Sequence, residues 1–453
     1  MASLKKLALR GAIWTIGGYG FSQGLRFGTN LVLTRLLVPE FFGLMAVVNT
    51  LRAGIDLFSD LGISQSIVNN KQGDDPNFLN TAWTLQVIRG FILWIFCLAI
   101  TLPSANFYDD ERLIWLIPIV GLSSVLDGFS SSAIHTLMRR MDLGRLTRFD
   151  ILIQAVSAIT LIMLASFYPT IWALAVGVVA GALYRMLGSH WLISGYKNRF
   201  AWDKHALKEL LSFGRWIFIA TALMFMAEQA DRLILGKLLS FQLLGVYTVA
   251  YTLANIPREI IKRVSHRVIF PAISNKADMS RSSLRSKIVH QRGKMLIAFA
   301  ILLAALVSIG DLVIATLYDK RYTEATWMMP ILCSGIWFSI LFFTISPALL
   351  AIGKPLYTAQ SNFARFIMIG IGLPLAFYRF GLTGVILAIA LSDLPLNIVN
   401  LYGLWREKLS CFIQDIQATV FFVGILAMFL IIRNSLGYGL PIDTILSNFL
   451  NIN

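Results

Sequence analysis

The sequence predicts an all-α polytopic membrane protein. In this prediction two six-helix lobes, related as parallel repeats, surround a central cavity, and one or two extra helices follow. The 453-residue chain is 57% hydrophobic and only 14% charged, whereas a soluble domain carries about 25% charged residues. Apolar runs of about 20 residues, each long enough to cross a bilayer as a helix, recur along the chain. The stretch 24–45 is echoed by the stretch 228–247, as in a chain built from two copies.

The repeat has an offset of 202 positions, which aligns Leu33 with Leu235 and Gly43 with Gly245. Two membrane halves around a midplane site are the design of a secondary transporter. The other aligned pairs are Trp14 and Trp216, Arg35 and Lys237, Leu36 and Leu238, Leu37 and Leu239, Thr50 and Thr252, and Leu51 and Leu253.

The apolar runs predict thirteen spans, of which the first twelve form two sets of six. The N-terminal lobe covers residues 1–194, the C-terminal lobe 209–405, and the extra helix or helices 406–453. The polar, basic segment 195–208 is predicted to be a cytoplasmic linker and to form an amphipathic surface helix. Whether a fourteenth helix follows is left open, and with it the side of the C-terminus. The predicted spans are residues 11–36, 41–64, 81–103, 112–136, 149–168, 171–194, 209–237, 242–271, 294–317, 327–352, 356–378, 380–404 and 414–433.

The net charge of +15 first suggests a nucleic-acid partner, but the basic residues lie mostly in short loops between apolar runs. That distribution follows the positive-inside rule and predicts a membrane protein with a cytoplasmic N-terminus and no nucleic-acid partner. Both copies keep the same parity, so the lobes are predicted to be parallel repeats. The loops that set the orientation contain Arg139, Arg140, Arg145 and Arg148, then Lys197, Arg199, Lys204 and Lys208, and then Lys276, Arg281, Arg285, Lys287 and Arg292.

The sequence lacks the motifs of nucleotide-binding, hydrolytic and metal-binding sites. The chain has no Walker A loop, no Gly-x-Ser-x-Gly motif and no metal-ligand spacing, so we expect no catalytic residues, no metal and no cofactor. Coupling to protons or sodium ions is left open. The three cysteines, Cys97, Cys333 and Cys411, lie in or beside apolar runs and are expected to be free thiols.

The first predicted span places Arg26 and Gln23 near mid-membrane among several glycines. An ionisable side chain at that depth is costly and is a functional candidate by default. One interpretation is an anion contact facing a cavity. The alternative is a close helix-packing seam with Arg26 snorkelling to the interface.

The second span carries Arg52, Asp56 and Asp60 at i, i+4 and i+8, on one helical face. Arg52 and Asp56 are spaced to pair within the helix. The face is predicted either to line a hydrophilic cavity, with Asp60 near its cytoplasmic mouth, or to hold a purely structural ion pair.

The seventh span contains Glu228, Gln229, Asp231 and Arg232. Glu228 and Arg232 are spaced to neutralise each other, and Asp231 then stays on a neighbouring face. A desolvated carboxylate can exchange a proton or bind a cation near neutral pH, so Glu228 and Asp231 are candidates for ion coupling or for a gate. The alternative is an ion-pair lock between the lobes.

The eighth span is predicted to kink or open at Pro257. A dense cationic patch follows it, with Arg258 the residue expected to face inward. Cationic donors bind phosphate groups well, although the patch also fits ordinary positive-inside charge. Asp393, which precedes Pro395, marks a second predicted kink. Arg365 and Asp393 are among the other buried charges, and most of these are expected to be structural pairs.

The sequence resembles the polysaccharide transporter family of lipid-linked oligosaccharide flippases, in the multidrug/oligosaccharidyl-lipid/polysaccharide exporter superfamily. The resemblance rests on TRLLVPEFFGLMA at 34–46, DLGISQSIV at 60–68, ADRLILGKLLSFQLLGVYTVAYTLANIP at 230–257, RVIFPAIS at 267–274, ALLAIGKP at 348–355 and GLTGVILA at 381–388. It implies a V-shaped fold in a bacterial cytoplasmic membrane and the transfer of undecaprenyl-pyrophosphate-linked oligosaccharide to the outer leaflet by alternating access.

The resemblance also implies that cationic cavity residues hold the pyrophosphate, and Arg26, Arg52 and Arg258 match best by position, with Gln23 and Gln229 beside them. A polysaccharide polymerase and a chain-length protein are the implied partners of an expected monomer. Two other functions are kept as alternatives: an ion-coupled multidrug exporter of the same superfamily, and a membrane glycan polymerase or ligase. The polymerase or ligase would need larger loops than this chain has.

Overall fold

The computed structural model describes residues 4–58, 63, 66–67, 73–140, 142–193, 198–204, 206–207, 225–226, 228–276 and 278–441. These residues form helices joined by short connections, and no strand occurs among them. The all-α prediction is therefore confirmed. The chain divides into two compact units, Met1–Phe225 and Met226–Asn453.

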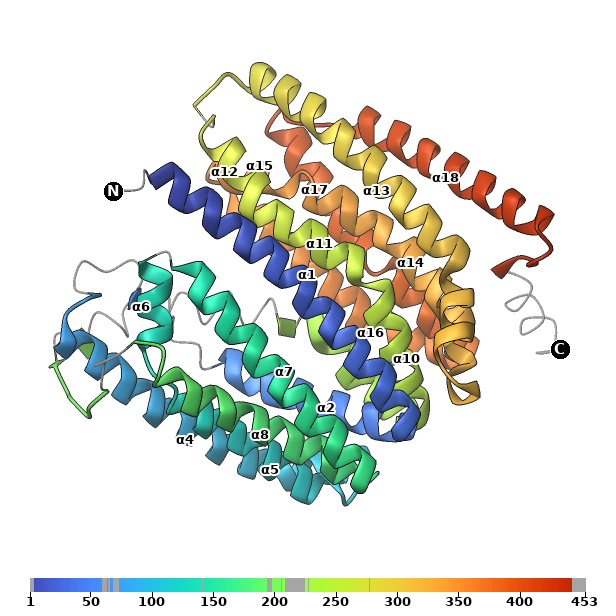
Figure 1. The fold of residues 1–453 in the computed structure, drawn as a ribbon. Helices are drawn as coiled ribbons and strands as arrows, with labels where there is room; N and C mark the ends of the chain where they lie inside the picture. Colours follow the sequence, from blue (N-terminus) through green and yellow to red (C-terminus); the bar gives the residue numbers. More distant parts are fainter. Residues whose placement is uncertain are drawn as a thin grey trace. The chain divides into compact units, whose positions relative to one another are not determined.

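The first unit is a bundle in which each long helix packs against its neighbours in a continuous series (Figure 1). In that series α1 packs against α7, α7 against α8, α8 against α5, and α5 against both α4 and α2. Its helices are α1 (Leu4–Leu36), α2 (Pro39–Phe58), α4 (Pro76–Tyr108), α5 (Leu113–Gly128), α6 (Ala133–Arg139), α7 (Leu143–Phe167) and α8 (Ile171–Ser189).

Local signals explain where several of these helices begin. The Asp75 carboxylate accepts a hydrogen bond from the Phe78 backbone N–H, and Pro76 occupies the first turn of α4, where no partner for its nitrogen is needed. Asp142 caps α7 through the Arg145 backbone N–H in the same way. Helices α5 and α6 meet at 58°, so the predicted fourth span is broken rather than straight.

The second unit is built around α14, which packs against α10, α11, α13, α16 and α17. Residues 228–238 are helical. The remaining elements are α10 (Phe241–Ala254), α11 (Ile256–Val264), a π-helical turn (Ser265–Ile269), α12 (Phe270–Ser274), α13 (Arg281–Leu317), a 3₁₀ turn (Lys320–Tyr322), α14 (Glu324–Phe343), α15 (Ser346–Ala351), α16 (Pro355–Leu391), α17 (Asp393–Arg406) and α18 (Phe412–Ser435).

Two predicted kinks are confirmed. Helix α10 ends at Ala254 and α11 starts at Ile256, directly before Pro257, because proline cannot continue the preceding hydrogen-bond ladder. Helix α16 ends at Leu391 and α17 begins at Asp393. A third break lies inside α16 at Gly381, whose φ of 57° belongs to the left-handed region that glycine adopts without steric cost. That break coincides with the predicted boundary between the spans 356–378 and 380–404.

The internal repeat is visible in local structure. Helix α1 ends at Leu36 and α2 begins at Pro39, and 202 positions later a helix ends at residue 238 and α10 begins at Phe241. Leu33 and its counterpart Leu235 are both buried, as are Gly43 and Gly245. Arg35 and Lys237 are both exposed. The aligned residues thus occupy equivalent environments in the two units.

Helix α18, predicted to lie outside the repeat, is fastened to α13 near both of its ends. Arg292 Nη1 lies 2.5 Å from Asp415 Oδ1, and Arg433 pairs with Asp311 through two contacts of 2.6 Å. Between them, the Trp337 ring of α14 stacks on Phe422 with centroids 4.7 Å apart. These contacts make α18 part of the second unit.

Seven helices of the described residues are long and apolar enough to cross a membrane, and an eighth if α5 and α6 form one broken span. The protein is therefore a multi-pass membrane protein, while the count of thirteen spans and the domain boundaries stay predictions. The amphipathic helix predicted for the linker is wrong at residues 198–203, which are not helical. Instead, the backbone N–H groups of Arg199, Ala201 and Asp203 donate to side chains of α4, namely Asn80, Thr84 and Thr81.

Candidate functional site

Arg26 and Gln23 lie on a part of helix α1 that few described residues of the first unit cover. The Arg26 side chain is exposed and Gln23 is half-buried. A Cβ added at Gly17, Gly20, Gly24 or Gly28 would meet no described atom within 4 Å. These four glycines therefore form no packing seam within the described part of this unit, although Gly18 does pack against Thr147 of α7.

Helix α2 carries the predicted Arg52–Asp56 pair. Arg52 Nη1 lies 2.9 Å from Asp56 Oδ2, so the pairing prediction is confirmed. The other Asp56 oxygen accepts a hydrogen bond of 3.2 Å from the Ser124 hydroxyl of α5. Arg89 Nη2 of α4 donates to the Asp56 backbone carbonyl at 2.6 Å. The acid is thus held by three helices. Asp60 lies outside the described residues.

Asp56 lines a cavity of about 200 Å³ inside the first unit. Asp127 and His135 also face it, from α5 and α6, together with Gln86 and Arg89 from α4. His135 Nδ1 has no hydrogen-bond partner among the described residues. Buried polar atoms are normally paired with protein or water, so a cavity with two carboxylates and such an atom is suited to hold water, a proton or a small cation.

Helix α11 brings Arg258 into a buried polar network in the second unit. Its guanidinium donates to the Ser339 hydroxyl of α14 at 2.7 Å and to the Tyr251 hydroxyl of α10 at 3.3 Å. It also forms an ion pair with Asp393 at the start of α17. Arg365 Nε of α16 lies 3.0 Å from the other Asp393 oxygen. Five helices therefore converge on one site.

The Arg258, Arg365 and Asp393 group, here called the two-arginine network, contains two cations and one carboxylate. All three residues are buried, and Asp393 is only 1% exposed. Burying a charge is costly unless it is paired and hydrogen-bonded. Because the single carboxylate is shared, these three side chains keep a net positive charge inside the second unit. Such a group is able to attract an anion.

The acidic residues of the seventh predicted span lie beside this network. Tyr247 donates to Asp231 Oδ2 at 2.8 Å, and its ring lies 5.5 Å from that of Tyr251. The predicted Glu228–Arg232 pair is wrong. Glu228 pairs with Lys262 of α11 instead, because the tertiary fold puts a flexible amine beside it.

Arg232 accordingly makes other contacts. Its Nη1 donates to Gln229 Oε1 at 2.8 Å, and its guanidinium lies 5.6 Å from the centre of the Tyr251 ring, within the range of a cation–π contact. Tyr251 therefore links the Asp231 region to Arg258 through a single aromatic side chain.

The sequence alone does not identify Arg365 or Asp393 as site residues. Both are charges inside apolar runs, but nothing in the spacing from Arg258 to Arg365 or Asp393 shows that the three meet. The available signal was that Arg258 in an apolar segment needs a carboxylate partner, and Asp393 directly follows an apolar run before a predicted kink.

Comparison with known proteins assigns the chain to a family. The family described as "Polysaccharide biosynthesis protein" matches residues 32–327, about two thirds of the chain. The chain belongs to this family. The match includes Arg52, Asp56, Glu228, Asp231 and Arg258, whereas Arg365 and Asp393 lie beyond it.

Curated relatives of this family member are named as proteins of polysaccharide biosynthesis or transport. It is 21% identical to the teichuronic acid biosynthesis protein TuaB of Bacillus subtilis over 82% of this chain and 76% of TuaB. It is 24% identical to the succinoglycan biosynthesis transport protein ExoT of Rhizobium meliloti, covering 59% of this chain and 53% of ExoT. The lipopolysaccharide biosynthesis protein WzxC of Escherichia coli is 23% identical, over 61% of this chain and 56% of WzxC.

Solved structures share the fold. The lipid II flippase MurJ in an inward closed conformation matches with a TM-score of 0.64 and 13% identity, over 94% of this chain and 99% of MurJ. An inward-facing multidrug resistance MATE family transporter of the MOP superfamily matches with a TM-score of 0.63 and 14% identity, over 84% of this chain and 94% of the other. This family member therefore has the fold of MOP-superfamily transporters.

Proposed function

We propose that this protein is a flippase that moves undecaprenyl-pyrophosphate-linked oligosaccharide from the cytoplasmic to the outer leaflet during polysaccharide biosynthesis. The family match over residues 32–327 is the observation that carries the proposal. The MOP-superfamily fold supports a transporter rather than an enzyme, and the names of TuaB, ExoT and WzxC are consistent with that pathway.

The physical task is to carry a charged head group through a bilayer. Burying a pyrophosphate in hydrocarbon costs far more than a protein can recover from apolar contacts. A cationic, hydrated route removes much of that cost. In this proposal the exposed Arg26, with Gln23 beside it, and Arg52 and Arg258 act on the anionic head, with Gln229 near the sugar. Alternating access then exposes the head to one leaflet at a time.

Ion coupling is a further part of the proposal. Asp56 lines the cavity of the first unit, and Glu228 and Asp231 lie beside the two-arginine network. These acids are proposed to exchange a proton or a sodium ion during transport. The protein is proposed to be a monomer in a bacterial cytoplasmic membrane with its N-terminus inside, working with a polymerase and a chain-length protein.

The deciding experiment is a deletion of the gene in its host. Lipid-linked oligosaccharide is expected to accumulate in the cytoplasmic leaflet, and re-expression of the wild-type chain should restore polysaccharide at the surface. Unchanged surface polysaccharide and no inner-leaflet accumulation would overturn the proposal.

A second candidate is an ion-coupled multidrug exporter, which the two carboxylates of the first-unit cavity favour because they suit cation exchange. The buried cations of the second unit suit an anionic substrate better than a cationic drug. The two functions separate in a drug-susceptibility assay: a flippase deletion should leave resistance to cationic drugs unchanged.

A further inference from the structure

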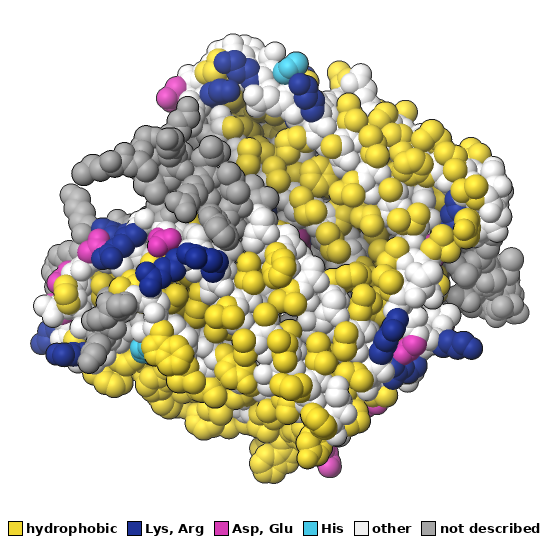
Figure 2. Space-filling view, viewed as in Figure 1, with side chains coloured by type: hydrophobic (Ala, Val, Ile, Leu, Met, Phe, Trp, Pro, Cys, Tyr) yellow, Lys and Arg dark blue, Asp and Glu magenta, His cyan; other side chains and the backbone are white. Residues whose placement is uncertain are grey.

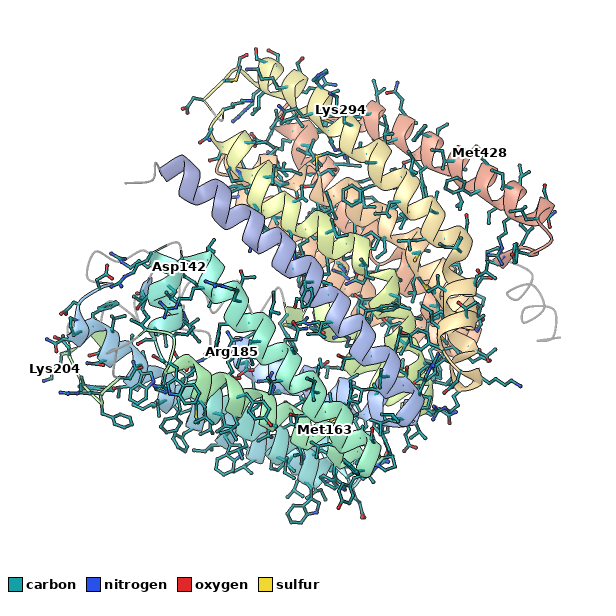
Figure 3. The ribbon with its side chains drawn as sticks, in the orientation of Figure 1. Asp142, Met163, Arg185, Lys204, Lys294 and Met428 are labelled. Atoms are coloured by element: carbon teal, nitrogen blue, oxygen red, sulfur yellow. The ribbon has the colours of Figure 1, made fainter. Side chains whose placement is uncertain are left out.

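Helices α7 and α8 form a closely packed helical hairpin in the first unit. Glycines on α8 face α7 at Gly177, Gly181 and Gly188, and small residues at such spacing let membrane helices approach closely. A Cβ at Gly188 would lie 2.9 Å from Phe149 Cε2, and one at Gly177 would lie 2.5 Å from Leu161 Cδ1. The seam is reinforced by an Arg185–Asp150 ion pair of 3.2 Å, and Figure 3 labels Arg185 on α8.

Beside this seam lies a groove of about 680 Å³, here called the α7–α8 groove. That volume falls within the ~300–1,000 Å³ range of sites that bind small molecules. Most of its lining is apolar, with Leu152 and Val156 from α7 and Leu187 from α8 exposed along it. Such a surface suits a hydrocarbon chain.

One end of the groove is cationic. Arg145 and Arg148 line it at the start of α7, three residues apart and therefore on one helical face. Both side chains are exposed. No carboxylate is among the described residues that line the groove. In Figure 2, dark blue side chains lie where α7 begins, and hydrophobic side chains cover much of the surface that continues along α7 and α8.

The same end also carries an aromatic side chain of the type found at membrane interfaces. Trp191 follows the end of α8, lines the groove and is 81% exposed. Tryptophan is enriched at the level of the lipid headgroups. Arg145, Arg148 and Trp191 therefore mark the headgroup level, and Leu152 and Val156 lie deeper in the hydrocarbon.

We propose that the α7–α8 groove binds an anionic phospholipid of the cytoplasmic leaflet. Its phosphate lies at Arg145 and Arg148, where guanidinium groups donate charge-assisted hydrogen bonds, and an acyl chain lies along Leu152 and Val156. The cytoplasmic side follows from the positive-inside distribution of these arginines.

The lining favours this occupant over a lipid-linked glycan. Apart from the two arginines, the polar side-chain groups among the described lining residues are the Tyr184 hydroxyl, which is already hydrogen-bonded to Thr160 at 3.2 Å, and the Trp191 indole. A sugar chain would need many more hydrogen-bond partners than these. A diacyl lipid with one phosphate needs only the two cations and the apolar lining of the groove.

The test uses the purified full-length chain in detergent and native mass spectrometry with added phosphatidylglycerol or phosphatidylethanolamine. The wild type is expected to retain phosphatidylglycerol preferentially. The double substitution Arg145→Ala/Arg148→Ala should weaken that binding by about tenfold or more, since it removes the charge-assisted hydrogen bonds to the phosphate. The matched control is Arg281→Ala/Arg285→Ala, which removes the same charge from the start of α13 and should leave binding unchanged.

A second pair of variants tests the apolar lining of the groove without changing the charge. Val156→Trp should fill the groove and displace the phospholipid, whereas Ile159→Trp, at an exposed α7 position outside the groove, should not. Equal retention of both lipids, or wild-type binding by the Arg145/Arg148 variant, would overturn the proposal. So would preferential retention of undecaprenyl phosphate over phosphatidylglycerol. These readouts measure lipid binding alone, so they fail or succeed independently of flippase activity.

Discussion

Arg258 and Asp393 form a buried ion pair that joins α11 to α17 in the second unit. The family resemblance predicts Arg258 as a ligand for a pyrophosphate, and the structure shows that it also has an internal partner. The Asp393 carboxylate does not neutralise Arg258 alone, because Arg365 shares the same carboxylate. A residual positive charge is compatible with an anionic substrate, and the two roles of Arg258 are separable by experiment.

Replacing Asp393 with asparagine should destabilise the protein strongly. The substitution leaves Arg258 and Arg365 buried without their carboxylate, and breaking a buried pair costs roughly 3–5 kcal/mol. The midpoint of thermal unfolding in detergent should therefore fall clearly. Asp319→Asn is the matched control, because it weakens the more exposed Asp319–Arg321 pair, whose kind contributes only about 0.2–1 kcal/mol. Equal midpoints for the two variants would mean that the two-arginine network contributes little stability.

Replacing Arg258 with alanine should abolish polysaccharide export while membrane insertion is kept. Loss of stability alone would give the same phenotype, so a triple variant is needed. Arg258→Met/Arg365→Met/Asp393→Leu removes all three charges together, and such apolar replacement is often neutral or stabilising. We expect this variant to unfold at or near the wild-type temperature and still to export nothing. Recovered export in the triple variant would show that Arg258 is only structural.

Replacing Asp56 with asparagine should change ion dependence more than stability. Its partner Arg52 is on the same helix, four residues earlier, and such pairs contribute about 0.3–0.5 kcal/mol. Flipping in proteoliposomes with an imposed pH or sodium gradient should lose its response to the gradient. Asp150→Asn serves as the control, since Asp150 also pairs with an arginine, Arg185, but neither residue is among the described residues that line the cavity. A gradient response that persists in the Asp56 variant would remove this acid from the coupling mechanism.

Loosening the start of α18 should expose Cys411. Arg292 ties this end of the helix to α13 and α14 through Asp415, Thr344 and the Leu341 carbonyl, and Cys411 is buried beside it. In a chain whose other two cysteines are replaced by alanine, Arg292→Ala should raise maleimide labelling of Cys411 by about tenfold. That change corresponds to a local opening free energy lowered by ~1.4 kcal/mol.

Arg433→Ala provides the comparison for this labelling experiment. It releases the opposite end of α18, where Arg433 pairs with Asp311, and should raise Cys411 labelling much less. The same increase in both variants would show that α18 opens as one piece rather than from its ends.

The sequence by itself determined the helical membrane fold, some helix ends such as Leu36, Ile171 and Leu317, the breaks next to Pro257 and Asp393, and the Arg52–Asp56 pair. Each of these depends on short-range information: hydropathy over about 20 residues, the missing N–H of proline, or the four-residue spacing of one helical face.

Only the tertiary structure decided which buried charges meet. Hydropathy shows that Arg258, Arg365 and Asp393 lie in apolar segments, but it does not show which helices become neighbours or how each is rotated. That is why Glu228 pairs with Lys262 rather than with Arg232, four residues away on its own helix. For the same reason the linker at 198–203 forms no helix and instead donates backbone hydrogen bonds to side chains of α4. A buried ion pair depends on distances of a few ångströms between helices, and packing alone sets those distances.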